Sequence, residues 1–284
     1  MGFIGSDDFY MMFAPVVVYW AYSGMYEVLS SRVEKYRLHS RKEEETKNLA
    51  SKKDVVKGVL LQQAIQAAIA FTVLQVCDRG LSYRSLSCFH HLTGDRAQIA
   101  AASAAATSPL HSLLVLAQQF LVAMFVFDAW QYFIHRYMHS NRQLYRQFHS
   151  WHHRVVAPYA FAAQYNHPVD GVVTETLAGA VAYFISGMSP RTAAFFFSVA
   201  TVKGIDDHCG LMLPWNPFHA VFRNNTAYHD IHHQLAGSKC NFSQPFFVMW
   251  DRILGTYAPY TLERREGGGF EARLVRKDKV GHDS

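Results

Sequence analysis

Residues 110–139 read "LHSLLVLAQQFLVAMFVFDAWQYFIHRYMH", a long apolar run that ends in two histidines. About 20 predominantly apolar residues let a helix cross a bilayer, so residues 110–134 are expected to form a membrane span. His135 and His139 follow directly and lie four residues apart, on one face of the helix if it continues. Neutral imidazole is a good ligand for iron, copper, nickel and zinc. The stretch therefore predicts a membrane helix with metal ligands at its end.

Two further histidine clusters share an HxxHH spacing. They read "HSWHH" at 149–153 and "HDIHH" at 229–233. Because positions i, i+3 and i+4 of a helix share a face, each cluster is expected to direct two or three imidazoles at one point. A single histidine is usually a surface residue, but three clusters with ligand spacing argue for metal binding. The cluster ligands would be His135, His139, His149, His152, His153, His229, His232 and His233.

The number of histidines argues for two metal ions. A catalytic zinc ion is held by about three protein ligands, so the cluster histidines exceed the needs of one zinc. Carboxylate di-iron sites in helix bundles use Glu-x-x-His pairs, and the sequence contains none. The HExxH signature of zinc proteases is also absent. We therefore expect a dinuclear, all-histidine site, with iron as the favoured metal.

Composition and further apolar runs place the chain in a membrane. Half of the 284 residues are hydrophobic and 17% are charged, against about a quarter charged in ordinary soluble domains. Residues 9–29 and 55–76 are expected to form two more spans. No basic segment precedes the first, so it is interpreted as an uncleaved anchor. Residues 171–203 predict two helices broken at Gly187–Pro190, which either cross the membrane twice or form a shorter hairpin.

The distribution of charge predicts the orientation of these spans. Basic residues concentrate in 31–53 and 264–279, next to apolar segments, and the net charge is +5. This placement is typical of juxtamembrane loops and argues against a nucleic-acid partner. The positive-inside rule places 31–53 in the cytosol. Three crossings then return the chain to the cytosol at His135, and an even number of passes through 171–203 brings the third cluster to the same face.

These observations predict an all-α fold: a multispan membrane helix bundle with a histidine-rich di-metal catalytic cap on the cytosolic face. We expect an N-terminal anchor region over 1–109 with two spans and connecting loops. A catalytic domain is expected over 110–260 and a flexible polar tail over 261–284. The four cysteines are scattered and none lies in a CxxC pair, so neither a disulfide framework nor a thiolate zinc site is indicated.

The sequence segments around the histidines resemble those of the fatty acid hydroxylase/sterol desaturase superfamily of membrane di-iron oxygenases. Within it, the chain is similar to plant sphingoid base hydroxylases, which act at carbon 4 of sphinganine. The resemblance covers roughly residues 110–260, and the part from Asp206 to Gln234 favours the sphingoid subgroup. The segments that carry it are "DAWQYFIHRYMH" (128–139), "FHSWHH" (148–153), "YNHPVDG" (165–171), "DDHCGLMLPWNPFH" (206–219) and "NNTAYHDIHHQ" (224–234).

The resemblance implies nine or ten histidine ligands. The eight cluster histidines match directly, and His208 resembles the family's additional ligand. His219, in "NPFH", is the next candidate, and His167, in "NHP", is either a ligand or a group that supports one. Some relatives carry another HxxxH, but Met212 stands four places after His208, which leaves the tenth position open. The histidines that match no motif are His39, His90, His91, His111 and His282.

Acidic residues near the clusters are candidates for orienting the imidazoles. A metal-bound histidine usually donates its second N–H to a carboxylate or carbonyl. Asp128 lies seven residues before His135, two turns along the same helix face. An acid inside an apolar span is usually functional, and a packing contact with a neighbouring span is the alternative. The other candidates are Asp207 and Asp230, followed by Asp170, Glu175 and Asp206.

Hydroxylation of an unactivated methylene needs a metal-based oxidant, because acid–base residues cannot remove its hydrogen. The resemblance implies two iron ions, dioxygen as co-substrate, and electrons from NAD(P)H delivered by a reductase and cytochrome b5. No haem or flavin motif occurs in the sequence. The resemblance also implies a membrane-lipid substrate, free sphinganine or its ceramide, at the endoplasmic reticulum. Chain-length preference and oligomeric state stay open, including homo-oligomers and hetero-oligomers with sphingolipid enzymes.

Other functions remain open from the sequence. Sterol C-4 methyl oxidases and wax-pathway aldehyde-processing enzymes share the superfamily. The latter often carry an additional C-terminal domain, whereas this chain stops soon after the third cluster, which counts against them. A membrane zinc hydrolase would need fewer ligands and a general-base glutamate. A metal transporter would place its ligands within the spans near the midplane, whereas these clusters lie at span ends and in the loops beyond.

Overall fold

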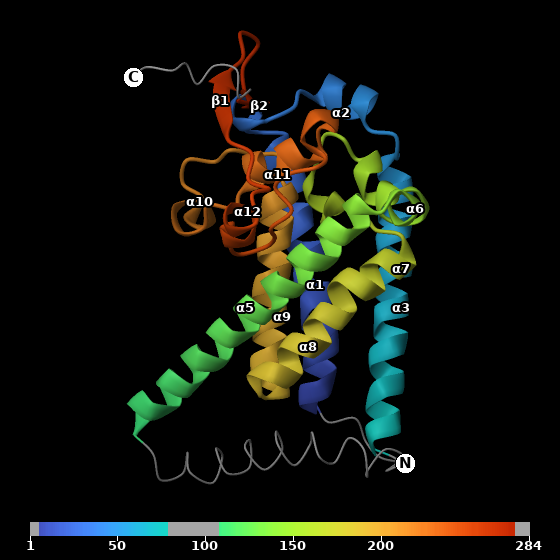
Figure 1. Ribbon diagram of the computed structural model, residues 1–284, viewed down its shortest axis with the longest axis vertical. Helices are drawn as coiled ribbons and strands as arrows, with labels where there is room; N and C mark the ends of the chain where they lie inside the picture. The colour runs from blue at the N-terminus through green and yellow to red at the C-terminus, as the bar shows by residue number, and fades with distance from the viewer. Residues whose placement is uncertain (1–5, 79–107, 276–284) are drawn as a thin grey trace.

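The structure is a computed structural model that describes residues 6–78 and 108–275, and this part of the chain is mostly helical. Figure 1 shows a stem of long helices below a cap of short elements. The stem consists of α1 (Ser6–Ser30), α3 (Lys52–Asp78), α5 (Pro109–Ser140), α7 (Pro168–Gly171), the π-helical η4 (Val172–Thr176), α8 (Leu177–Ser186) and α9 (Pro190–His208). The cap consists of η1 (Glu34–Tyr36), α2 (Arg41–Lys47), α6 (Arg142–Gln147), η2 (His149–Arg154), η3 (Ala160–Gln164), α10 (Pro217–Val221), α11 (Thr226–His233), η5 (Leu235–Gly237), α12 (Met249–Ile253), β1 (Tyr260–Arg264) and β2 (Phe270–Leu274).

Three helices of the described residues are long and apolar enough to cross a membrane. The first two overlap the predicted spans 55–76 and 110–134, and the third contains α7, η4 and α8. Large apolar side chains remain exposed along all three, for example Leu61, Leu121 and Ile185. Extended apolar surface is unusual on soluble proteins, so the stem is expected to face lipid. The bounds of the three helices are Lys52–Gln75, Pro109–Ser140 and Pro168–Ser186.

The other expected crossings are also helical, in α1 and α9. The predicted first span, 9–29, lies within α1, which is not one of the three helices above. It packs along α9, while α5 packs along α8. The predicted break in 171–203 is confirmed: α8 ends at Gly187, whose φ of 64° favours glycine, and Ser189 caps α9 before Pro190. The chain therefore reverses direction between α8 and α9 at the far end of the stem (Figure 1).

Polar side chains join α3 to its neighbours inside the stem. Gln63 accepts a hydrogen bond from the indole N–H of Trp20 and donates one to Gln164, each 2.9 Å long. Gln62 is fully buried against Gly171, where an added Cβ would lie 1.7 Å from the Gln62 amide nitrogen. A larger side chain at position 171 would therefore displace the amide end of Gln62. The Gln62 contact holds α7 against α3, next to the histidine clusters.

The C-terminal part of the described chain corrects two expectations. Strands β1 and β2 form an antiparallel hairpin, so the described chain is mostly helical rather than all-α. Ala272 is buried, and Gln234 on the α11 side donates to its carbonyl over 3.0 Å. The predicted flexible tail 261–284 is thus wrong for residues 261–275, because the hairpin packs on α11; residues 276–284 lie outside the described chain. The domain divisions at 109 and 260 stay predictions.

Residues 34–47 and 260–274 enclose α11 from above, and we call these two segments the collar. Figure 1 shows α2 and the hairpin at the same end of the cap, above α11. The backbone N–H of Phe270 donates to the carbonyl of Arg37 over 2.7 Å, which joins the two segments. Their apolar side chains pack with those of α11 in one cluster. Its buried members are Leu38, Ala227, Ile231 and Ala272.

Candidate metal centre

Nine histidines converge at the junction of stem and cap, in two groups. Within each group, one ring nitrogen per histidine lies within 4.8 Å of those of the others. The ends of α5 and α9 supply the stem members, and η2 and α11 supply the rest. The five-histidine group contains His135, His139, His149, His153 and His232. The four-histidine group contains His152, His208, His229 and His233.

Each HxxHH motif supplies both groups. The first and last histidines of a motif join one group, and the middle histidine, His152 or His232, joins the other. Each motif therefore directs two of its imidazoles at one point, as predicted, and the third imidazole at the other. Adjacent helical residues point about 100° apart, so the i+3 and i+4 rings diverge and reach two points. In addition, η2 is a 3-10 helix rather than an α-helix.

The two groups adjoin one another. The ring centroids of His153 and His233, which belong to different groups, are 4.8 Å apart. Those of the sequence neighbours His152 and His153 are 5.6 Å apart. One continuous cluster of imidazoles therefore joins the two groups. The arrangement has the form of a site for two neighbouring metal ions.

Hydrogen bonds at Nδ1 hold six of the nine rings. An acceptor at Nδ1 requires the proton there, which leaves the lone pair of Nε2 free to bind a metal. Five acceptors are backbone carbonyls, and one is a carboxylate. The pairs are His135 with Phe242 O (2.9 Å), His149 with Asp170 Oδ2 (2.8 Å), His152 with Tyr165 O (3.2 Å), His208 with Gly204 O (2.8 Å), His232 with Cys240 O (2.8 Å) and His233 with Val155 O (2.9 Å).

The Nε2 atoms face one another at the spacing that metal ligands adopt. With a metal–nitrogen bond of about 2.1 Å, neighbouring ligand atoms lie about 3 Å apart. The Nε2 atoms of His208 and His229 are 2.9 Å apart, and those of His139 and His153 are 3.0 Å apart. The buried Nε2 atom of His135 has no hydrogen-bond partner within the described residues. A cation would bind these converging lone pairs, so the donor set fits a metal.

Burial keeps the imidazoles in the form that binds metal. In the cap, burial lowers the pKa of His152, His153, His229 and His233 well below the ordinary value of 6.5. Burial likewise lowers the pKa of His208 to about 4 and that of His232 to about 3. Each of these rings is therefore neutral at physiological pH. A neutral ring is the ligand that transition metals require.

The three principal acidic candidates contact none of the nine rings directly. Asp128 accepts hydrogen bonds from the backbone N–H groups of Phe246 and Phe247, so it supports His135 only through the loop that follows Phe242. Asp207 forms a buried ion pair with Lys203 on the preceding turn of α9. Asp230 contacts His39 instead. Since side chains of successive helical residues diverge, an acid beside a ligand in sequence points elsewhere.

Asp170 is the acid that orients a ring. Its Oδ2 lies 2.8 Å from Nδ1 of His149, and its side chain is 1% exposed. The sequence offered it only as one of several weaker candidates, within "YNHPVDG". Nearby, Glu175 accepts hydrogen bonds from Gln66 and Asn166 rather than from a histidine. Only the fold reveals that α7 brings the carboxylate of Asp170 to η2.

The two remaining histidine candidates lie outside both groups. Nε2 of His219 is 3.5 Å from a carboxylate oxygen of Asp206 and 3.3 Å from the amide nitrogen of Asn216. Nδ1 of His167 accepts a hydrogen bond from the backbone N–H of Val169 at the start of α7. The structure therefore brings together nine of the predicted ligands, with His208 among them and without His219 or His167.

Two aromatic residues that the sequence did not single out line the five-histidine group. The Tyr145 ring, on α6, lies 5.2 Å from the ring of His139 and 5.8 Å from that of His153. The Phe242 ring lies 5.6 Å from the ring of His232. Tyr145 stands between two histidine clusters in the sequence, which is the one signal that pointed to it. Both rings pack against the imidazoles of this group.

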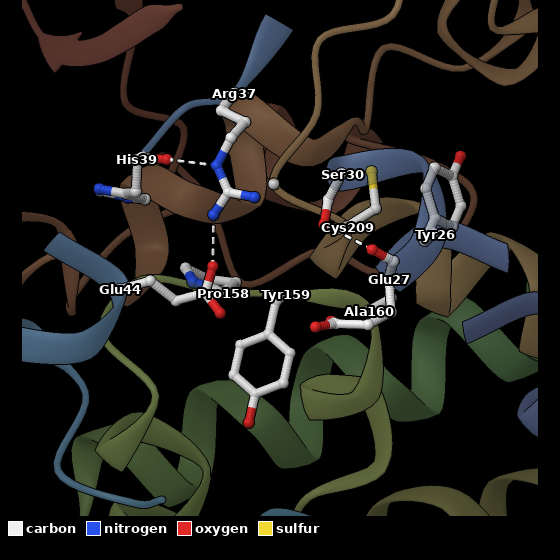
Figure 2. Close-up of a pocket in the computed structure, with 11 residues that line it drawn as sticks. Tyr26, Glu27, Ser30, Arg37, His39, Glu44, Pro158, Tyr159, Ala160 and Cys209 are labelled. Atoms are coloured by element: carbon white, nitrogen blue, oxygen red, sulfur yellow. Dashed lines mark hydrogen bonds and ion pairs between the residues drawn. The ribbon is translucent and has the colours of Figure 1, made fainter. Parts of the chain in front are cut away.

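A small cavity is lined by His39, a histidine that matched no motif (Figure 2). Its volume is about 10 Å³, enough for about one water molecule. Nε2 of His39, one of its lining residues, lies 2.6 Å from Oδ1 of Asp230. Arg37 donates from Nε to the His39 carbonyl over 2.9 Å and forms an ion pair with Glu44. The collar thus reaches α11 through a buried polar contact.

Comparison with known proteins identifies relatives over nearly the whole chain. The sequence profile described as fatty acid hydroxylase matches residues 120–256. The chain is 57% identical to sphinganine C4-monooxygenase 1 of Arabidopsis thaliana, over 98% of each chain. It is 39% identical to sphingolipid C4-hydroxylase sur2 of Schizosaccharomyces pombe, over 87% of each. No solved structure matches.

A third relative concerns the alternative of a wax-pathway aldehyde-processing enzyme. The chain is 51% identical to very-long-chain aldehyde decarbonylase GL1-9 of Oryza sativa subsp. indica, over 95% of this chain and 96% of that protein. That relative is covered almost completely, so the expected C-terminal extension does not separate the two kinds of enzyme. The identities and the lengths covered together place the sequence in one family: this chain belongs to the fatty acid hydroxylase family.

Proposed function

We propose that this protein hydroxylates carbon 4 of a sphingoid long-chain base, converting sphinganine, free or in its ceramide, to the phytosphingosine form. The observation that carries the proposal is its 57% identity over 98% of its length to a sphinganine C4-monooxygenase. The relative from fission yeast carries a name of the same activity. The convergence of nine buried histidines supports an oxidative reaction of this kind.

The overall reaction defines what the site must supply. One C–H bond, dioxygen, two electrons and two protons give one C–O–H group and one water. Two iron ions, held by the two histidine groups, would supply the activation of dioxygen that amino-acid side chains cannot provide. The nine imidazoles would hold these ions in a fixed geometry, and the Nδ1 contacts would fix the ring planes. Burial of the rings would keep bulk water from the reacting carbon.

The stem and cap suggest how a lipid substrate reaches the site. We propose a multispan bundle in the endoplasmic reticulum membrane, with the cap on the cytosolic face. The basic segment 31–53 contributes to the same cap as the histidines, which supports this orientation by the positive-inside rule. An acyl chain would then lie along the apolar stem while its polar head stays near the histidine end. The head and the reacting carbon would be held at the interface.

Two electrons per turnover must reach the metals from outside the chain. We propose NAD(P)H as their source and cytochrome b5 with its reductase as the carrier, at the cytosolic face. The exposed residues of α6, Arg142 and Arg146, lie on the helix that also carries Tyr145 beside the five-histidine group. Electrons that arrive at this side of the cap would have a short path from the surface to the imidazoles.

A second candidate function is aldehyde processing in wax synthesis. It is favoured by the 51% identity to a protein named very-long-chain aldehyde decarbonylase, covered over almost all of its length. The same histidine site would hold the metals for either reaction. The two candidates differ in the product that must be sought.

Expression in a yeast strain that lacks its own sphingolipid C4-hydroxylase tests the proposal. We expect mass spectrometry of the long-chain bases to detect phytosphingosine with the wild-type chain and none with His152→Ala. The matched control is His167→Ala, a nearby histidine outside both groups. Alkanes from a supplied long-chain aldehyde, with no phytosphingosine, would instead establish the second candidate. A membrane-resident, iron-loaded protein that forms neither product would refute both.

A further inference from the structure

We propose that His39 is a positioning residue for the metal centre: through Asp230 it sets the orientation of α11 and therefore the directions of the three histidines that α11 supplies. The inference rests on the proposed function, because it takes these histidines to be metal ligands. It assigns a role to the N-terminal part of the collar, which lies outside the family profile at 120–256.

The contact between His39 and Asp230 is short and buried. Nε2 of His39 lies 2.6 Å from Oδ1 of Asp230, and the two side chains are 9% and 2% exposed. The other carboxylate oxygen of Asp230 accepts a hydrogen bond from Gln234 over 3.0 Å. Asp230 follows His229 directly in α11, so any rotation that moves the carboxylate also moves the ligand rings. The contact therefore restrains the angle of α11 about its own axis.

His39 is itself held on a rigid support. Arg37 donates to the carbonyl of His39 and forms a partly buried ion pair with Glu44 in α2. Arg265, from the hairpin, donates to the carbonyl of Leu38 and pairs with Glu43. Both segments of the collar thus fix the backbone on either side of position 39. Because these bonds hold the backbone at Leu38 and His39, the His39 ring has a fixed position from which it restrains α11.

The ring of His229 shows why α11 needs an external restraint. Its Nδ1 atom is buried and has no hydrogen-bond partner within the described residues, whereas six other rings are held at Nδ1. The direction of this ring therefore follows from the helix that carries it. Since α11 has only eight residues, it has little stability without tertiary contacts. Loss of the His39 contact is expected to affect the four-histidine group first, because α11 supplies two of its members, His229 and His233.

The test compares variants of the full-length protein in lipid nanodiscs. His39→Gln keeps a side-chain donor toward Asp230. The double variant His39→Leu with Asp230→Leu removes the polar link without leaving an uncompensated buried charge, which protects the fold. Arg41→Gln is the matched control, since it removes an exposed ion pair with Glu34 in the same segment and leaves the partners of Arg37 in place. Two quantities are measured: hydrogen exchange of residues 226–234 in the metal-free protein, and cobalt(II) binding followed by its visible spectrum.

We expect the double leucine variant to bind the first cobalt ion as wild type does and the second about 10- to 100-fold more weakly, the range typical of lost outer contacts to metal ligands. Exchange in 226–234 should accelerate about 10-fold by the same reasoning. His39→Gln should restore both quantities, and Arg41→Gln should change neither. Wild-type affinities and exchange in the double variant would overturn the inference, as would equal weakening of both ions. A wild-type protein that binds no pair of ions would overturn the proposed function, and this inference with it.

Discussion

The two histidine groups are built from the same two motifs, yet they differ in their surroundings. Every member of the four-histidine group is buried, and those of its rings that are held at Nδ1 contact backbone carbonyls. The five-histidine group includes the partly exposed His139 and lies against Tyr145. It also has a carboxylate partner, Asp170, at His149. The comparison teaches that the two histidine groups are inequivalent: one is fully buried and held by backbone carbonyls, and the other has a carboxylate partner and a partly exposed ring.

The largest effect is expected from removing ligands by group rather than by motif. The double variant His153→Ala with His232→Ala removes two ligands of the five-histidine group, although the residues come from different motifs. We expect it to retain the metal of the four-histidine group. In contrast, His152→Ala with His153→Ala takes one ligand from each group and should weaken both metals. In each case, hydroxylation should fall more than about 100-fold, beyond the range for outer contacts.

Metal content per purified chain, measured by plasma mass spectrometry over a range of chelator concentrations, checks this expectation. The division of the motifs would be disproved if the same-motif variant lost a single metal and the same-group variant lost both.

A smaller effect is expected at Asp170. Asp170→Asn keeps an oxygen that accepts from Nδ1 of His149 but removes the charge, so the affinity of one metal should fall about 10- to 100-fold. The ion in the four-histidine group should be unaffected, because none of its rings contacts Asp170. Cobalt(II) titration resolves the two affinities.

Asp206→Asn is the control for this experiment. Asp206 is a buried acid that contacts Tyr26 and Asn216 but no ring of either group. Equal losses for Asp170→Asn and Asp206→Asn would mean that the carboxylate of Asp170 acts on the fold and not on one metal.

The smallest effect is expected at His219, which the family resemblance suggested as a ligand. His219→Ala removes a contact with Asp206 at the edge of the cap and should lower the free energy of unfolding by about 1 kcal/mol. Metal content should stay at the wild-type level, because the ring belongs to neither group. A loss of one metal in this variant would show that the site closes around His219 when metal binds.

The sequence predicted those parts of the molecule that depend on local pattern. The span 110–134 follows from apolar length, and the break at Gly187 follows from turn and capping chemistry. The eight cluster histidines follow from their spacing, and His208 follows from the family resemblance. Each of these signals lies within a few residues of the chain or in a shared motif, so no knowledge of tertiary packing was needed.

The remaining parts depend on tertiary geometry. The division of each motif between two groups depends on how η2 and α11 are rotated about their axes, which spacing alone does not reveal. Five of the six Nδ1 acceptors are backbone carbonyls, for example those of Tyr165 and Gly204, and any residue type supplies a carbonyl. For the same reason Asp230, although it lies between two ligands, was assigned to the wrong partner: it faces His39 from a distant part of the sequence.

The collar has a consequence for how this enzyme can be divided. The family profile covers 120–256, but the apolar side of α11 is covered by Leu38 from before that region and Ala272 from after it. A fragment limited to the shared region would expose Ala227 and Ile231 and would leave the carboxylate of Asp230 without His39. The catalytic segment is therefore not a transferable module. The boundaries of the family profile and those of the folding unit are different, and a chimera between relatives must exchange all three pieces together.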